Sequence, residues 1–248
     1  MPFTFAHPAA VLPLRRWLPL PALTAGALAP DLAYYLPVPG GADRTHSVTG
    51  LYTTDLVLGA ALTLIGYLVL APVLALAPMG WRARAVPPDP ARWRGPRAIA
   101  VAVCALVVGA VTHLGWDAFT HTGGAAVRAL PFLRAPVIGP HRLYNVLGYA
   151  SSAGGLLVLG ALAVRWYRRT APEQGERWRA LPHSLRAWTL CAFVVSAAAG
   201  AVVALGDPVR EASAYDWVRL LLIGAVQGGC AALAAYVLAW HLAPPGRR

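Results

Sequence analysis

The residues best suited to do chemistry in this sequence lie between Val111 and His121. His113, Asp117 and His121 follow one another at intervals of four residues. On a helix this spacing places all three side chains on one face, one turn apart. Imidazole nitrogens and carboxylate oxygens are common ligands of divalent metal ions, so such a stripe could share one ion or two.

The surroundings of this stripe strengthen its interpretation. The three residues end a long apolar run that begins near Ala98. Ionisable groups inside such a run are costly to place in a membrane and are usually kept for a function. The pattern therefore favours a metal-binding or proton-handling site. The alternative is a structural role, in which His113 and Asp117 only hydrogen-bond each other and fix neighbouring helices.

The composition identifies the class of protein that carries this stripe. The chain has 248 residues, of which 58% are hydrophobic and only 12% are charged. Soluble domains carry about 25% charged residues, and a membrane span needs about 20 consecutive apolar residues. Several runs here reach that length, whereas a transmembrane β-barrel would show alternating segments of about 10 residues. The sequence therefore predicts an all-α fold, a multi-pass transmembrane helix bundle.

Five spans are clear and a sixth is weak. The weak one, Trp17–Leu36, contains four prolines when its immediate neighbour Pro37 is included, and it is expected to be either one kinked span or a re-entrant pair of short helices. We expect the whole chain, 1–248, to form a single integral membrane domain, with the chemistry-bearing residues in 1–160 and generic spans in 161–248. The clear spans are 51–77, 98–121, 143–167, 190–205 and 217–242.

The net charge of +11 does not indicate a nucleic-acid partner. All 21 basic residues are Arg, and most of them fall in alternate loops, such as 79–97 and 168–186. This asymmetry follows the positive-inside rule and predicts a protein of the cell (inner or plasma) membrane with these loops in the cytoplasm. With Trp17–Leu36 counted as a span, both the N- and C-termini are expected to be cytoplasmic. Cys104, Cys191 and Cys230 lie in apolar runs and form no metal-binding spacing.

This topology brings polar residues from several spans to one membrane depth, at the extracytoplasmic face. We expect the His46 imidazole to lie within roughly 4–8 Å of the Asp117 carboxylate, in direct contact or across one ion. His183 and His241 fall elsewhere and are expected to be solvated or interfacial. The residues that share the outer depth are Asp31, Asp43, His46, Asp55, Asp117, His121 and His141.

Three blocks of sequence carry a resemblance to a known family. They are Met1-Pro-Phe-Thr-Phe-Ala-His-Pro8 with Ala29-Pro-Asp31, then Arg44-Thr-His-Ser-Val-Thr-Gly50, then Thr112-His-Leu-Gly-Trp-Asp-Ala-Phe-Thr-His121. Together they resemble a bacterial family of multi-pass membrane proteins catalogued as a domain of unknown function, over roughly the first 160 residues. More distantly, they are similar to predicted membrane-bound metal-dependent hydrolases, which have Ser-His where this chain has Thr112-His113.

The resemblance implies a polar set of five residues. They are His7, Asp31, His46, His113 and Asp117. His7 can join the others only if residues 8–30 form a re-entrant hairpin, which the prolines permit. Otherwise His7 is an interfacial residue without a role as a ligand.

The leading hypothesis is an enzyme, a metal-dependent hydrolase working at the extracytoplasmic membrane face on a lipid-like or phosphoester substrate. Its cofactor would be a divalent ion, zinc or manganese, that activates a water molecule. The metal ligands would be His7, His46, His113 and Asp117, while Asp31 would be a ligand or general base and His121 or His141 would protonate the leaving group.

Two other classes of function fit the same residues. Chains of Asp and His inside a membrane also serve as proton relays in transporters. A non-catalytic scaffold could use the same polar cluster to lock its helices together. Nucleotide-binding and serine-hydrolase functions have no support, since the sequence has neither a P-loop nor a G-x-S-x-G motif.

Overall fold

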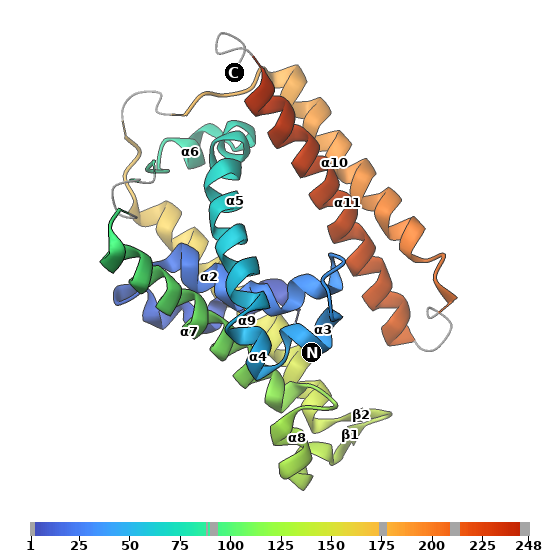
Figure 1. The fold of residues 1–248 in the computed structure, drawn as a ribbon. Helices are drawn as coiled ribbons and strands as arrows, with labels where there is room; N and C mark the ends of the chain where they lie inside the picture. Colours follow the sequence, from blue (N-terminus) through green and yellow to red (C-terminus); the bar gives the residue numbers. More distant parts are fainter. Residues whose placement is uncertain (1–2, 88, 90–93, 174–177, 209–213, 244–248) are drawn as a thin grey trace. The chain divides into compact units, whose positions relative to one another are not determined.

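The structure is a computed structural model that describes residues 3–87, 89, 94–173, 178–208 and 214–243. Helices make up most of it (Figure 1), and the β-structure within these residues is one two-stranded ribbon. The predicted all-α fold is confirmed.

Five helices of the described chain are long and apolar enough to cross a membrane. Their large side chains are often exposed, as at Leu64, Leu157 and Val194. A soluble protein would bury such residues, whereas lipid accepts them. The predicted multi-pass membrane protein is thus confirmed at this level. The helices are α5 (Thr54–Leu76), α7 (Pro96–Thr120), α9 (Leu143–Arg169), α10 (His183–Ala204) and α11 (Ala214–Leu242).

The N-terminal stretch forms a string of short helices in place of one long span. The string has five short helices, and every one of them except the first has a proline in its first turn. Proline is tolerated there but breaks a helix further in, so each proline starts a new element. The longest piece, α2, has nine residues and covers about 13 Å, well short of the roughly 30 Å of a bilayer core. The string comprises η1 (Thr4–Ala6), α1 (Pro8–Val11), η2 (Leu12–Arg16), α2 (Leu20–Leu28) and η3 (Ala29–Tyr34).

Internal contacts divide the chain into two compact units. The first comprises 1–66 and 88–170, and the second comprises 67–87 and 171–248. The clustered candidate site residues, described below, all belong to the first unit. A single integral membrane domain stays a prediction.

Close packing of α2 on α7 forms the centre of the first unit. A Cβ atom on Gly26 would collide with the backbone of Leu106, and one on Gly109 would collide with the backbone at Leu23 and Ala27. Only glycine lets two helix backbones approach so closely, which is a common way to pair helices in membranes. The contact fixes the position of α2 relative to the histidine-bearing end of α7.

Helix α9 holds both η1 and α7. The Phe3 amide donates a hydrogen bond to Ser152 Oγ (2.8 Å), and the Trp116 indole donates one to Ser151 Oγ (3.0 Å). Gly155 faces Ala6 so closely that a Cβ there would meet the Ala6 backbone at 2.9 Å. These small residues of α9 therefore position the N-terminal segment beside α7.

Two short helices, α3 (Gly41–Thr45) and α4 (Val48–Leu51), carry the Thr-His-Ser block. The Thr45 hydroxyl donates to the Pro30 carbonyl (2.7 Å), which ties α3 to η3. Ser47 caps α4 by accepting from the Gly50 amide (2.9 Å). The residues on either side of His46 thus fix the backbone on which His46 stands.

The segment between α7 and α9 has more structure than the loop expected there. It contains α8 (Ala125–Ala129), η5 (Pro131–Arg134), and a ribbon of β1 (Pro136–Ile138) and β2 (His141–Arg142). Val127, Leu133 and Tyr144 form a small core beneath it.

In the second unit, α6 (Met79–Arg82) follows α5, and α10 packs closely on α11 through Gly200, Gly224 and Gly228. Pro72 lies inside α5 and, because it has no N–H group, cannot donate to the Leu68 carbonyl one turn earlier. His241 Nε2 donates to that carbonyl at 3.0 Å. His241, expected to be solvated or interfacial, therefore also satisfies a backbone group that the proline leaves free.

Candidate metal centre

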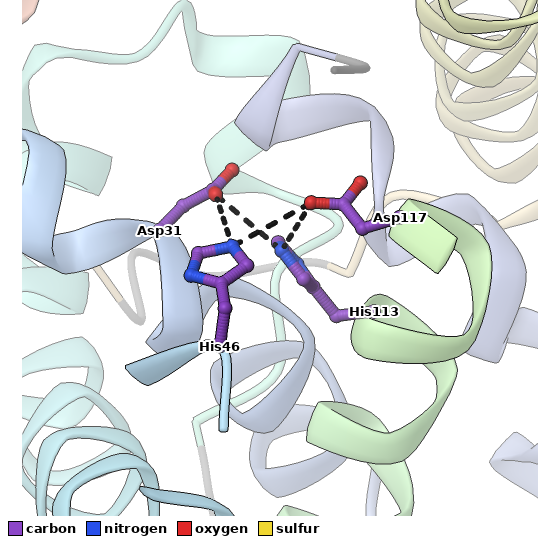
Figure 2. A group of neighbouring side chains, drawn as sticks. All are labelled: Asp31, His46, His113 and Asp117. Atoms are coloured by element: carbon purple, nitrogen blue, oxygen red, sulfur yellow. Dashed lines mark ion pairs between the residues drawn. The ribbon is translucent and has the colours of Figure 1, made fainter. Parts of the chain in front are cut away.

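Four side chains from three parts of the first unit meet at one point (Figure 2). Asp31 comes from η3, His46 from the end of α3, and His113 and Asp117 from successive turns of α7. Each offers one ligand atom, and these four atoms all lie within 4.8 Å of one another. The predicted approach of His46 to Asp117 is confirmed, and at 3.5 Å the contact is closer than the expected range.

The separations between these atoms match those of metal ligands. His113 Nε2 lies 3.4 Å from Asp31 Oδ1 and 3.5 Å from Asp117 Oδ2. His46 Nε2 lies 3.5 Å from each of the same two oxygens. A tetrahedral site with ligand bonds of about 2.1 Å has edges of about 3.4 Å. Four of the six edges between the ligand atoms therefore have the length that a zinc-like ion requires.

Two backbone hydrogen bonds orient the imidazoles toward this point. His113 Nδ1 donates to the Ala27 carbonyl (2.8 Å), and His46 Nδ1 donates to the Ala42 carbonyl (3.0 Å). A carbonyl can only accept, so each Nδ1 carries the proton and each Nε2 is left to face the cluster. Histidines that bind metals are commonly oriented in this way.

Burial makes the cluster costly unless something fills it. Asp31 and His113 are 0% exposed and Asp117 is 4% exposed. The atoms that face the centre, including His113 Nε2 and both Asp31 oxygens, have no hydrogen-bond partner among the described residues. Buried polar atoms almost always have a hydrogen-bond partner, and the imidazole–carboxylate contacts of 3.4–3.5 Å in this cluster are longer than charged hydrogen bonds. A divalent cation would satisfy these atoms together, so the residues present fit a metal.

The charges within the cluster respond to one another. Burial would raise the pKa of Asp31, but the imidazoles of His113 and His46 outweigh burial and hold that pKa below its usual value. Burial would lower the pKa of His46, but the carboxylates of Asp117 and Asp31 outweigh it and raise the pKa to about 9. The carboxylate pair thus attracts positive charge to the position that a cation would occupy.

His7 joins the cluster, as the resemblance implies. It is 4% exposed, its ring stacks on His113 with centroids 3.8 Å apart, and its Nε2 lies 3.8 Å from Asp117 Oδ1. Burial and the neighbouring His113 lower the pKa of His7 to about 4, so the ring is neutral near pH 7. The short helices of 8–30 therefore return the chain to the cluster, as a re-entrant hairpin would.

The two histidines predicted to protonate a leaving group differ in position. His121 Nε2 lies 3.7 Å from Asp117 Oδ2, and its side chain is 35% exposed. It therefore stands at the open edge of the cluster. His141 lies on β2 with its Nδ1 3.4 Å from the Tyr149 hydroxyl, and its described contacts do not include a residue of the cluster. A proton-transfer role for either residue stays a prediction.

Asp55 is a buried acid close enough to interact electrostatically with the cluster, and the sequence placed it at the right depth but not among the candidate ligands. It lies in the first turn of α5, is 1% exposed, and neither carboxylate oxygen has a hydrogen-bond partner among the described residues. Its charge interacts with His46 and His113. An acidic residue in the first turn of a helix is common, because it stabilises the positive end of the helix dipole. Nothing in the sequence therefore indicates that this one is buried.

The chain belongs to the family described as a domain of unknown function (DUF4184), whose model matches residues 1–238. The predicted resemblance to a family catalogued as a domain of unknown function is confirmed, and the match extends well beyond the first 160 residues, whereas the bacterial origin of the family stays a prediction. Neither a curated protein nor a solved structure matches the chain significantly. The likeness to metal-dependent hydrolases stays a prediction.

Proposed function

We propose that this member of the family is a membrane-embedded, metal-dependent hydrolase. The observation that carries the proposal is the meeting of four ligand atoms that have no hydrogen-bond partner among the described residues and lie at the separations of a metal site. A scaffold cluster that only locked helices together would gain most from charged hydrogen bonds of about 2.7–2.9 Å, whereas the imidazole–carboxylate contacts here are 3.4–3.5 Å long. Zinc or manganese fits the mixture of two imidazoles and two carboxylates.

The residues of the cluster divide the chemistry between them. His46, His113 and Asp117 would hold the ion, which lowers the pKa of a bound water toward neutrality. Asp31 would complete the ligand set or accept a proton from that water. His121 would donate a proton to the leaving group, since it contacts Asp117 and is also partly open to solvent.

The substrate we propose is an amphiphile with a phosphoester group. A groove of about 550 Å³ is lined by Leu36–Pro39, Thr53–Thr54 and Val57–Leu58 and is mainly apolar. The Arg44 guanidinium donates to the Thr53 hydroxyl (3.3 Å) at this groove, and Arg44 is two residues from His46. An acyl chain suits the groove, and a guanidinium pairs well with a phosphate.

We propose that the protein resides in the cell membrane with its cluster at the extracytoplasmic face and its C-terminus in the cytoplasm. A cytoplasmic N-terminus would require Trp17–Leu36 to cross. The short helices of that stretch and the place of His7 beside Asp117 favour an N-terminus on the side of the cluster.

The test is metal content combined with turnover. The full chain would be produced in metal-replete cells, purified in mild detergent and assayed by elemental analysis. Hydrolysis of bis(p-nitrophenyl) phosphate and of a short-chain phospholipid would be followed with and without a chelator. We expect stoichiometric zinc or manganese and hydrolysis that the chelator abolishes. Protein without metal would overturn the proposal, and metal without hydrolysis of either compound would favour a transporter or a scaffold.

A further inference from the structure

The four ligand atoms described above include only one of the two oxygens of each carboxylate, Asp31 and Asp117. Asp31 Oδ1 and Asp117 Oδ2 face His46 and His113, but Asp31 Oδ2 and Asp117 Oδ1 are also buried and have no hydrogen-bond partner in the described chain. In Figure 2 these second oxygens both point upward, away from the body of the His46 ring. Two carboxylates placed in this way can bridge two ions.

His7 places a ring nitrogen close to one of these free oxygens, Asp117 Oδ1. Its Nε2 is buried without a hydrogen-bond partner and lies 3.8 Å from Asp117 Oδ1. That distance is too long for a hydrogen bond and suits two ligands of a common ion, whose bonds are each about 2.1 Å long. Stacking on His113 fixes the plane of the His7 ring.

We propose that a second divalent cation binds His7 Nε2, Asp117 Oδ1 and Asp31 Oδ2, so that Asp31 and Asp117 bridge a two-metal centre. This inference rests on the proposed function and deepens it. Ions bridged by carboxylates lie about 3.5–4 Å apart, the spacing used by enzymes that cleave phosphoesters.

The two metal positions would differ in whether a coordination position is left open for water or substrate. Four protein ligands fill a tetrahedral ion, which is the arrangement of a structural site. Three protein ligands leave the second ion an open position for water or a substrate oxygen, which is the arrangement of a catalytic site. With both ions bound, the open position would therefore lie on the second ion. With the first ion alone, Asp31 would act as the general base and a water molecule would take the fourth position.

The charge count of the two-metal centre favours a bound hydroxide. Two divalent cations bring four positive charges, against three buried carboxylates in this region, those of Asp31, Asp55 and Asp117. The remaining positive charge favours the hydroxide form of a bound water, which is the nucleophile in hydrolysis.

The packing around His7 offers a way to test the site without touching a ligand. Ala6 precedes His7 and presses against Gly155 of α9, where a larger side chain must displace it. The adjacent Gly154 has nothing within 4 Å of its Cβ position. Gly155→Leu should therefore move His7 from the centre, and Gly154→Leu should not.

The experiment counts ions in the full-length protein purified in detergent after growth in manganese. We expect two ions in wild type, in His183→Ala and in Gly154→Leu, and one in His7→Ala and Gly155→Leu. Electron paramagnetic resonance should show a spin-coupled manganese pair in the first group and an isolated ion in the second. All variants should elute as the wild type does in size-exclusion chromatography.

The outcomes distinguish failure of the second metal site from failure of the proposed hydrolase function. One ion in both wild type and His7→Ala would overturn the second site and leave the hydrolase proposal standing. No ion in wild type would overturn both. Two uncoupled ions in wild type, both retained in His7→Ala, would also overturn the bridged arrangement.

Discussion

His113 and Asp117 differ from an ordinary surface pair because neither side chain can exchange its partner for water. We expect His113→Ala and Asp117→Asn each to abolish stoichiometric metal binding, since the remaining atoms cannot complete the site. Asp117→Asn keeps an acceptor and loses only the charge, so a purely structural cluster would tolerate it. Elemental analysis of purified protein measures the effect. His183→Ala, which alters a histidine outside the cluster, should retain its metal.

The cluster atoms that lack hydrogen-bond partners also predict how the ion affects stability. An ion that binds only the folded state adds about 4 kcal/mol when its free concentration is 1,000 times Kd. Chelation should therefore lower the Tm of the wild-type protein by several degrees. The same chelator should not change the Tm of Asp117→Asn, which we expect to lack the ion already. An equal shift in both proteins would mean that the ion is bound elsewhere.

Several residues of the site could be identified from the sequence alone. His113 and Asp117 stood out because ionisable residues are rare in apolar runs, and His46 because its depth matched theirs. The orientation of each imidazole could not be predicted, since it depends on carbonyls of Ala27 and Ala42 that any residue would provide. The burial of Asp55 depends on packing that no local pattern encodes.

At the scale of elements, the contact between α2 and α7 positions the Ala27 carbonyl, which orients the His113 ring. Gly109→Leu should push α2 away, and with it the Ala27 carbonyl that orients His113. Loss of such an outer contact lowers metal affinity by about 10–100-fold. The matched control is Gly115→Leu on the same helix, because a Cβ at Gly115 meets nothing within 4 Å. Metal titration of the two variants in detergent distinguishes them, and equal affinities would contradict the role of this contact.

The groove beside α3 gives a second prediction at this scale. Arg44→Ala should raise KM for an anionic phospholipid by about 10-fold or more, since a charged hydrogen bond is worth about 1.5–3 kcal/mol, and should change kcat little. Arg134→Ala provides the control, because Arg134 is exposed in η5 and lies outside the residues that line the groove. A similar rise in both variants would indicate general attraction of anions rather than recognition by Arg44.

The elements themselves were predictable to different degrees. The spans follow from hydropathy, and α7 at Pro96–Thr120 and α9 at Leu143–Arg169 begin and end close to the predicted limits. The N-terminal helices were harder, because prolines show where a helix stops but not how the pieces fold back. The ribbon of β1 and β2 is too short to leave a periodic pattern.

For the whole molecule, five crossings predict termini on opposite sides of the membrane. Reporters fused after Pro87 and after Pro172 should lie in the cytoplasm, and those fused after Leu133 and Pro208 should lie outside. A tag at the N-terminus should be reached by an impermeant label from the outer side, like the Leu133 fusion. A tag that only permeabilised cells reveal would show that Trp17–Leu36 crosses and that His7 does not share the cluster.

The distance along the chain between the members of the cluster has a consequence for how the protein is made. Ribosomes deliver about 5–20 residues per second, so His7, Asp31 and His46 exist for several seconds before His113 and Asp117 emerge. During that interval the early residues have no partners from α7, and α2 can pack against α5, near Gly59, but not yet against α7. We therefore expect the N-terminal helices to complete their packing only after α7 has been inserted. Nascent chains halted before Pro96 should leave this segment open to protease, and chains halted after α9 should protect it.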